Sequence, residues 1–367
     1  MQPDQVKTLQ DARAAVQASP HTHVKVGIFD VDGILRGKYM SKPKFLSALD
    51  GGFGFCDVIV GWDSDDQLYD NVKITGWHTA YPDASVRVIP ESCRALPFEQ
   101  DLLFFLAEFD GYAQAVCPRG TLGKMVQKAT DMGFIPMSAC EFEFFVFDET
   151  PDSVRDKGYQ NLKPITPGNF GYSVIRNSVW AEFYHGLLEL CEQMRMPIEG
   201  LHTETGPGVL EAALAVTETM ESADRAALFK TFTKVFAERN DMMATFMAKW
   251  SPDYPGQSGH VHVSLKTLAG DSVFYDPAGE NSMSETGRHF LGGLQRHLPD
   301  FLSMISPTVN SYSRLVPGAW APTAATWSVE NRTTALRVIP GSAKSQRVEV
   351  RIAAADMNPY IAQAAIL

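Results

Sequence analysis

Three short segments of the chain alternate a side chain that binds metal or phosphate with an apolar one. Residues 141–144, 260–263 and 347–351 read Glu-Phe-Glu-Phe, His-Val-His-Val and Arg-Val-Glu-Val-Arg. In a β-strand, residues two apart point to the same face of the sheet. The three segments therefore predict strands that gather carboxylate, imidazole and guanidinium groups on one face. Such a face could hold a divalent metal together with phosphate.

Two further carboxylates have a spacing that can bring them together. Glu204 and Glu211 flank a Gly-Pro-Gly turn at residues 206–208. Clustered carboxylates repel each other and raise each other's pKa unless a cation neutralises them. Five glutamates with one or two histidines form an oxygen-rich set that suits Mg²⁺ or Mn²⁺ better than a structural zinc. The residues leave the choice between these two ions open.

Basic residues that could clamp phosphate or carboxylate groups are concentrated in the last part of the chain. Guanidinium groups bind both anions with two parallel hydrogen bonds. The candidates are Arg314, Arg332, Arg337, Lys344, Arg347 and Arg351.

Each of these patterns also has an ordinary structural explanation. The 141–144 pair could be a solvated strand edge, Glu204 and Glu211 a surface turn, and Glu349 part of an ion-pair ladder. A separate motif at residues 29–35, Phe-Asp-Val-Asp-Gly-Ile-Leu, is similar to the nucleophile loop of haloacid-dehalogenase-type phosphatases. Ile34 stands where that family has threonine, so we interpret Asp32 and Gly33 as a hairpin turn.

The composition indicates a soluble globular protein and excludes some classes. The chain has 367 residues, 45% hydrophobic and 20% charged, with a net charge of −11. This charge and the lack of a basic run argue against nonspecific nucleic-acid binding. Five cysteines without a C-x-x-C pair indicate reduced thiols, and hence a cytoplasmic protein. No apolar run approaches the ~18 residues of a membrane span, and the polar N-terminus predicts no signal peptide.

The periodicity predicts a mixed α+β fold. Residues 22–115 read as a small β-rich domain, with strands at 23–32, 85–89 and 101–109 and a turn at 50–52. Beyond it we expect helices at 121–132, from Ser178 to Met196 and from Ser222 onward, and a loop at 151–172. Asn358 and Pro359 mark another helix start. Because that helix has no stop signal before Leu367, we expect the natural chain to continue.

In order along the chain, these motifs resemble the glutamine synthetase superfamily. The matching segments read Glu-x-Glu-Phe-Phe, His-x-His-x-Ser-Leu, Asn-Ser-Tyr-x-Arg-Leu-Val-Pro-Gly and Arg-x-Glu-x-Arg. The resemblance implies a β-grasp domain at 22–115 and a catalytic domain at 116–367 with an antiparallel sheet flanked by helices. It also implies an ATP-dependent ligase that joins the γ-carboxyl of L-glutamate to ammonia or an amine. Such enzymes form rings, usually two stacked hexamers, with each active site between neighbouring subunits.

The resemblance implies a role for each candidate residue. Glu143, Glu204 and Glu211 would hold one metal, and Glu141, His260 and Glu349 a second one. Glutamate would bind to Arg314, Arg351 and Gly256. The nucleotide and the transferred phosphoryl group would be held by His262, Ser264, Arg332, Arg337, Lys344 and Arg347.

Two positions depart from the glutamine synthetase pattern. Trp320 stands where those enzymes carry an acidic residue that helps to bind ammonium, and Cys56 stands in place of a second acid, with Asp57 following it. Losing both acids makes the acceptor pocket more apolar, and Trp320 offers a cation–π face. We therefore expect a γ-glutamyl amine ligase, similar to the γ-glutamylpolyamine and γ-glutamylalkylamide synthetases. Two alternatives stay open: glutamine synthesis, with Asp57 compensating, and a non-catalytic homologue.

Overall fold

The computed structural model describes residues 2–367 and divides into two compact units. Unit 1 comprises the residues up to Lys124 together with Leu190–Arg195. Unit 2 comprises Met125–Glu189 and Met196–Leu367. No helix in the described part of the chain has both the length and the hydrophobicity needed to cross a membrane.

Unit 1 is built on a six-stranded sheet with strand order β2-β1-β6-β4-β3, in which β5 also pairs with β6. The pair β1·β6 is parallel and the other pairs are antiparallel. The strands are β1 (His23–Phe29), β2 (Leu35–Ser41), β3 (Phe53–Cys56), β4 (Asp83–Val88), β5 (Arg94–Leu96) and β6 (Leu102–Phe109). All three strands predicted in this region are present, with slightly different bounds.

The turn between β1 and β2 is the hairpin predicted at Asp32 and Gly33. Gly33 has φ +76°, a left-handed conformation that glycine adopts without strain. Asp30 is fully buried, and its Oδ1 accepts hydrogen bonds from the backbone N–H groups of Asp32 and Ile34. Its Oδ2 accepts one from Arg36 Nε at 2.8 Å. This carboxylate therefore organises a turn, which argues against a phosphatase nucleophile.

Unit 1 contains two helices that were not predicted, α1 (Leu9–Ala18) and α2 (Lys42–Gly51). Thr8 caps α1 by accepting a hydrogen bond from the N–H of Asp11. The two residues form a capping box that was not recognised in the sequence. The turn predicted at residues 50–52 was wrong, because Asp50 and Gly51 form the last turn of α2. Gly52, with φ +69°, ends the helix.

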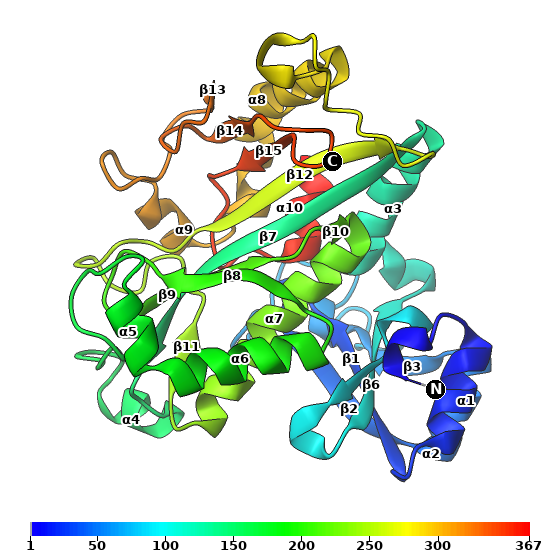
Figure 1. Ribbon diagram of the computed structural model, residues 1–367. Helices are drawn as coiled ribbons and strands as arrows, with labels where there is room; N and C mark the ends of the chain where they lie inside the picture. The colour runs from blue at the N-terminus through cyan, green and yellow to red at the C-terminus, as the bar shows by residue number, and fades with distance from the viewer. Residues whose placement is uncertain (1) are drawn as a thin grey trace. The chain divides into compact units, whose positions relative to one another are not determined.

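Unit 2 contains a nine-stranded sheet in the order β13-β14-β15-β12-β7-β9-β8, with β10 and β11 also pairing with β7. It is antiparallel except for the parallel pair β13·β14. Figure 1 shows β7 and β12 as two long strands side by side. The strands are β7 (Phe134–Phe147), β8 (Ile198–Thr203), β9 (Val209–Leu214), β10 (Thr217–Glu218), β11 (Met243–Thr245), β12 (Gly259–Thr267), β13 (Trp327–Val329), β14 (Leu336–Ile339) and β15 (Arg347–Val350).

The remaining helices confirm some of the predicted boundaries and correct others. Asn358 caps the last helix by accepting a hydrogen bond from the N–H of Tyr360, as predicted. The caps predicted at Ser178 and Ser222 were wrong, because both residues lie inside helices that begin earlier. A short helix also interrupts the loop predicted at 151–172. These helices are α3 (Pro118–Asp131), α4 (Pro151–Asp156), α5 (Val174–Val179), α6 (Ala181–Gln193), α7 (Thr219–Arg239), α8 (Glu285–Ile305), α9 (Val309–Arg314) and α10 (Pro359–Ile366).

The apolar face of β7 forms an aromatic core with α7. Phe142 and Phe144 are fully buried, and both contact Phe229 of α7, with ring centroids 6.3 and 5.9 Å apart. Phe246 packs against Phe144 at 5.1 Å. Burying one phenylalanine side chain contributes about 1.5–3 kcal/mol. Since Phe142 and Phe144 alternate with Glu141 and Glu143, this packing directs both carboxylates to the opposite face.

One half-buried lysine borders this aromatic core. Lys230 of α7 donates a hydrogen bond from Nζ to the carbonyl oxygen of Met357 at 2.7 Å, and its Nζ lies 5.5 Å from the ring centroid of Phe142. Burial lowers the pKa of Lys230 to about 7, and the nearby Lys234 adds to this shift. The folded protein thus releases a proton from this lysine at a pH where the unfolded chain retains it.

We expect Lys230 to make the stability of the protein depend on pH between about 7 and 10.5. Over this range the unfolded chain binds the proton and the folded chain does not, so the free energy of unfolding rises with pH. The slope reaches at most about 1.4 kcal/mol per pH unit. Chemical denaturation at pH 7–9 should show this slope in the wild type and in a surface control, Lys128→Met. Lys230→Met should have a smaller slope, because only the lowered pKa of Lys234 remains, and equal slopes in all three proteins would contradict the assignment.

Candidate active site

The register of the unit 2 sheet places the predicted carboxylates and imidazoles in adjacent positions. His260 of β12 lies opposite Glu141 of β7, and His262 lies opposite Glu349 of β15. On the other side of β7, Glu143 lies opposite Glu211 of β9. The alternation along each strand then puts these side chains on one face, as the three segments predicted.

The first group of donor atoms lies around Glu349. One ligand atom each from Glu141, His262 and Glu349 falls within 4.8 Å of the others. His260 joins this group, with its Nδ1 3.2 Å from Glu349 Oε1 and 3.5 Å from Glu141 Oε1. Glu349 is only 1% exposed. The strands therefore bring together three predicted ligands of one metal and add His262, which was predicted to bind the nucleotide.

The second group differs from the predicted one in one member. Ligand atoms of His202, Glu204 and Glu211 lie within 4.8 Å of one another. The Oε2 of Glu143 accepts a hydrogen bond from the N–H of Ser258 at 2.5 Å, and its role as a ligand here stays a prediction. His202 was missed by the sequence analysis. Its position two residues before Glu204, at the end of β8, is the same alternation that marked the other strands.

A tyrosine covers this second group and was also missed. The Tyr172 ring stacks on the His202 imidazole, with centroids 4.3 Å apart and planes inclined by 25°. Tyr172 is 69% exposed and has φ +56°, an unusual backbone conformation for a bulky residue. Residue spacing carries no signal for it, because Tyr172 lies in a loop about thirty residues before its partner.

The electrostatics of the site indicate where positive charge is lacking. Burial raises the pKa of Glu211, and the charges of Glu141 and Glu143 add to this shift, although His202 opposes it. Burial alone would also raise the pKa of Glu349, but His260, His262 and two arginines outweigh burial and lower it. A divalent cation would relieve the repulsion around Glu211. The donor set thus fits a hard metal ion.

The two arginines predicted to bind glutamate, Arg314 and Arg351, are both buried. Arg314 is 4% exposed and donates from Nη1 to the carbonyl oxygen of Ile352 at 3.1 Å and from Nη2 to that of Arg351 at 3.0 Å. Burial lowers its pKa to about 10, so it remains charged at neutral pH. A Cβ on Gly256 would lie 2.4 Å from Arg314 Cγ, so only glycine fits beside this side chain.

The remaining arginines of the sheet contact the donor groups directly. Arg337 Nη1 donates to Glu349 Oε2 at 3.1 Å, and Arg351 pairs with the other oxygen of the same carboxylate. Arg347 Nε donates to His262 Nδ1 at 3.1 Å. Arg337 Nε is buried and has no hydrogen-bond partner among the residues that the structure describes. A buried donor of this kind is costly unless a ligand satisfies it, which fits an anion at this position.

Four of the predicted site residues lie outside both groups of donor atoms. Arg332, Lys344 and Trp320 have exposed side chains on loops, whereas Ser264 is half-buried on β12. Trp320 is 70% exposed with φ +55°. These loop residues stay predictions, since the sheet geometry does not draw them into either group.

Cys56 and Asp57 lie in unit 1. The Cys56 thiol is half-buried and donates to the carbonyl oxygen of Tyr81 at 3.5 Å. Asp57 is fully buried and accepts hydrogen bonds from Thr75 Oγ1 at 2.6 Å and from the Tyr112 hydroxyl at 2.8 Å. Burial and this carboxylate together raise the pKa of Tyr112 to about 12. Both carboxylate oxygens of Asp57 thus accept hydrogen bonds from residues of unit 1.

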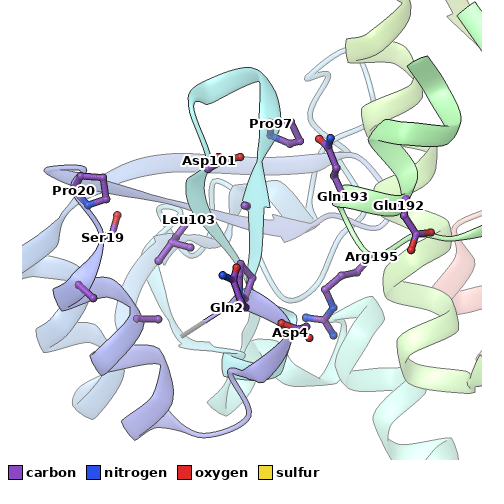
Figure 2. A pocket seen from close by; sticks show the side chains of 14 residues that line it. Gln2, Asp4, Ser19, Pro20, Pro97, Asp101, Leu103, Glu192, Gln193 and Arg195 are labelled. Atoms are coloured by element: carbon purple, nitrogen blue, oxygen red, sulfur yellow. The ribbon is translucent and has the colours of Figure 1, made fainter. Parts of the chain in front are cut away.

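Unit 1 also contains a cavity of about 740 Å³, shown in Figure 2. Its lining includes Gln2, Asp4, Asp101 and Arg195 and contains none of the predicted site residues. Arg195 Nη1 donates to the carbonyl oxygens of Glu91 and Cys93, so this guanidinium already serves to hold the backbone. The predicted metal ligands, in contrast, all lie in unit 2.

Comparisons with known proteins identify the family. The family "Glutamine synthetase, catalytic domain" matches residues 115–367, and the chain belongs to it. The chain is 47% identical to type-1 glutamine synthetase 2 of Dictyostelium discoideum, over 95% of this chain and 68% of that one. It is 32% identical to a glutamate–isopropylamine ligase of Pseudomonas sp., over 94% and 76% of the two chains. The solved structure of apo GmaS superimposes with a TM-score of 0.80 at 26% identity, covering 96% of this chain and 78% of that one.

These findings confirm the recognition made from the sequence motifs. The protein is a ligase of the glutamine synthetase family with a mixed α+β fold. Members of this family use ATP and divalent metal ions.

We expect Mg²⁺ or Mn²⁺ to raise the thermal unfolding midpoint, because a cation that binds only the folded state stabilises it. The gain is about 2.7 kcal/mol at a metal concentration one hundred times Kd. Glu211→Gln and Glu349→Gln should each reduce the metal-induced shift. Glu285→Gln, whose parent side chain is 88% exposed, serves as the matched control and should keep the full shift. An equal shift in all four proteins, measured by differential scanning calorimetry, would argue against metal binding at these carboxylates.

Proposed function

We propose that this protein joins the γ-carboxyl of L-glutamate to a primary amine, using ATP and passing through γ-glutamyl phosphate. The choice of acceptor depends on one observation: both carboxylate oxygens of Asp57 already accept hydrogen bonds. Glutamine synthetases need carboxylates that attract ammonium, and here Trp320 and Cys56 occupy both expected acidic positions. Asp57 was the remaining candidate, but its carboxylate is fully buried and bonded to Thr75 and Tyr112. It is not available to bind a cation.

Aromatic side chains support an acceptor with a hydrocarbon body. Trp320 and Tyr172 are both largely exposed, and Tyr172 lies over His202 at the second group. The pKa of Tyr172 is raised by partial burial and by the negative charges of Glu204 and Glu211. Aromatic faces bind both alkyl chains and ammonium groups.

We assign the metals to two ligand sets, Glu141, His260 and Glu349 in one and Glu143, Glu204 and Glu211 in the other, with His202 beside the second. Either Mg²⁺ or Mn²⁺ suits them. When bound, the metals would neutralise charge on the ATP phosphates. Arg332, Arg337, Lys344 and Arg347 would hold these phosphates, with His262 and Ser264 near the nucleotide. Arg314 and Arg351, beside Gly256, would hold glutamate.

The chemistry follows from these placements. A γ-carboxylate oxygen of glutamate attacks the γ-phosphorus of ATP, and the bond from that phosphorus to ADP breaks. A neutral amine then attacks the carbonyl carbon, the C–O bond to the phosphoryl group breaks, and phosphate leaves with the glutamate oxygen. The amine loses its proton to solvent or to a site carboxylate. Arginines positioned before the reaction stabilise the developing charge without reorganisation.

One specific observation favours glutamine synthesis as the second candidate. The relative that shares 47% identity with this chain is named a glutamine synthetase. The relative at 32% identity is named for isopropylamine, which supports an amine as the acceptor. A non-catalytic homologue is a lesser candidate, because all six proposed metal ligands are present.

We extend the proposal to the domains and the assembly. Residues 22–115 would form a β-grasp domain and residues 116–367 the catalytic domain. The parallel central pair β1·β6, with α2 following the β1–β2 hairpin, supports the first assignment. The family match from residue 115 supports the second. The resemblance supports a cytoplasmic homo-oligomer, with a dodecamer of two hexameric rings as the expected form.

Phosphate release with ATP, Mg²⁺ and glutamate tests the proposed acceptor. We expect faster turnover with one class among alkyl, aryl and polyamines than with ammonia. A preference for ammonia would establish the second candidate. If the full-length natural protein turns over no acceptor with either metal, the protein is a non-catalytic homologue.

We expect Trp320→Glu to shift the acceptor preference toward ammonia, because the new carboxylate attracts ammonium and removes the apolar wall. The ratio of kcat/KM for amine to that for ammonia should fall roughly tenfold or more, which corresponds to at least about 1.4 kcal/mol. Trp320→Phe, which keeps an aromatic ring, is the matched control and should stay close to the wild-type ratio. An unchanged ratio in Trp320→Glu would remove Trp320 from the acceptor pocket.

A further inference from the structure

The loop that carries Tyr172 is held to the end of β8 by one buried threonine. Thr203 is 4% exposed. Its Oγ1 accepts a hydrogen bond from the N–H of Ser173 at 2.8 Å and donates one to the carbonyl oxygen of Phe170 at 2.9 Å. Its own carbonyl oxygen accepts from the N–H of Tyr172 at 2.7 Å. Three hydrogen bonds from one residue thus fix both ends of the segment 170–173.

The same threonine also orients the imidazole under the tyrosine ring. His202 Nδ1 lies 3.0 Å from the carbonyl oxygen of Thr203, and because a carbonyl only accepts, Nδ1 carries the proton. His202 Nε2 then faces Glu211 Oε1 at 3.4 Å. Thr203 therefore contacts both partners of the Tyr172–His202 stack. It fixes the imidazole through its carbonyl oxygen, and the loop through its carbonyl and hydroxyl together.

The backbone of Tyr172 shows why such an anchor is needed. Its φ of +56° is a left-handed conformation that bulky residues rarely adopt. An exposed loop would relax from it unless hydrogen bonds held it in place. Removing the Thr203 hydroxyl would leave the Ser173 N–H and the Phe170 carbonyl without their partner, and the ring would lose its fixed position over His202.

We propose that Thr203 is a positioning residue, whose hydroxyl holds Tyr172 at the acceptor side of the site and so determines how tightly the amine binds. This inference rests on the proposed function. Thr203 is too buried to contact substrate, so it acts through Tyr172. Its hydroxyl must both accept and donate, which serine can do and the isosteric valine cannot.

The test compares Thr203→Val with Thr203→Ser and with the control Thr231→Val. Thr231 lies on α7, where its hydroxyl donates to the carbonyl oxygen of Ala227 within the same helix. In Thr203→Val, we expect amide hydrogen exchange in residues 170–173 to be roughly tenfold faster and the KM for the amine to rise by roughly tenfold. The KM values for ATP and glutamate should change less than about twofold. Thr203→Ser should restore both readouts, and Thr231→Val should leave both unchanged.

Three results would overturn the proposal. Unchanged exchange in Thr203→Val would mean that the hydroxyl does not hold the loop. Faster exchange with an unchanged amine KM would mean that the loop does not serve the acceptor. A rise in all three KM values without rescue by serine would indicate a general packing defect. If the wild type prefers ammonia, the proposed function is wrong. The same variants are then compared by their KM for ammonia, and this comparison tests the role of Thr203.

Discussion

Repulsion between carboxylates gathered on one sheet face is the constraint on which the rest of this structure depends. Glu141, Glu143 and Glu211 lie on neighbouring strands, and their mutual charge, added to burial, raises the pKa of Glu211. Bringing such groups together costs free energy unless cations or hydrogen-bond donors compensate. On the β12–β15 side, His260, His262 and the arginines compensate Glu349. On the β8–β9 side, His202 does so only in part, and a metal ion would complete the balance.

The apolar side of the sheet makes this costly arrangement possible. Phe142 and Phe144 pack into the aromatic core with α7 and thereby fix which way Glu141 and Glu143 point. Arg314 contributes in a similar way, because its two hydrogen bonds to the backbone at residues 351 and 352 hold the segment that follows β15. The site is thus preorganised by aromatic packing and by hydrogen bonds to the backbone, as electrostatic catalysis requires.

The sequence predicted those parts of the site that depend on alternation. Residues 141–144, 260–263 and 347–351 were predicted to share a face, and strand pairing places His260 opposite Glu141 and His262 opposite Glu349. His202 was missed although it precedes Glu204 by two residues, because nothing in its own segment showed that β8 would pair with β9. Tyr172 and the hydrogen bonds of Asp57 were beyond prediction, since both depend on contacts between segments distant in the chain. In unit 1, α1 was missed although Thr8 caps it, and α2 begins without a side-chain cap that could have marked its start.

The proposed reaction requires this sheet face to activate a carboxylate as an acyl phosphate. The most direct measurement is the transfer of ¹⁸O from glutamate labelled in its γ-carboxyl group to the released phosphate, with ATP, metal and the best acceptor present. The account predicts that one labelled oxygen appears in each phosphate, because the oxygen that attacks the γ-phosphorus leaves with it. Phosphate without label, released together with the amide product, would contradict the account, since the carboxylate would then not have been phosphorylated.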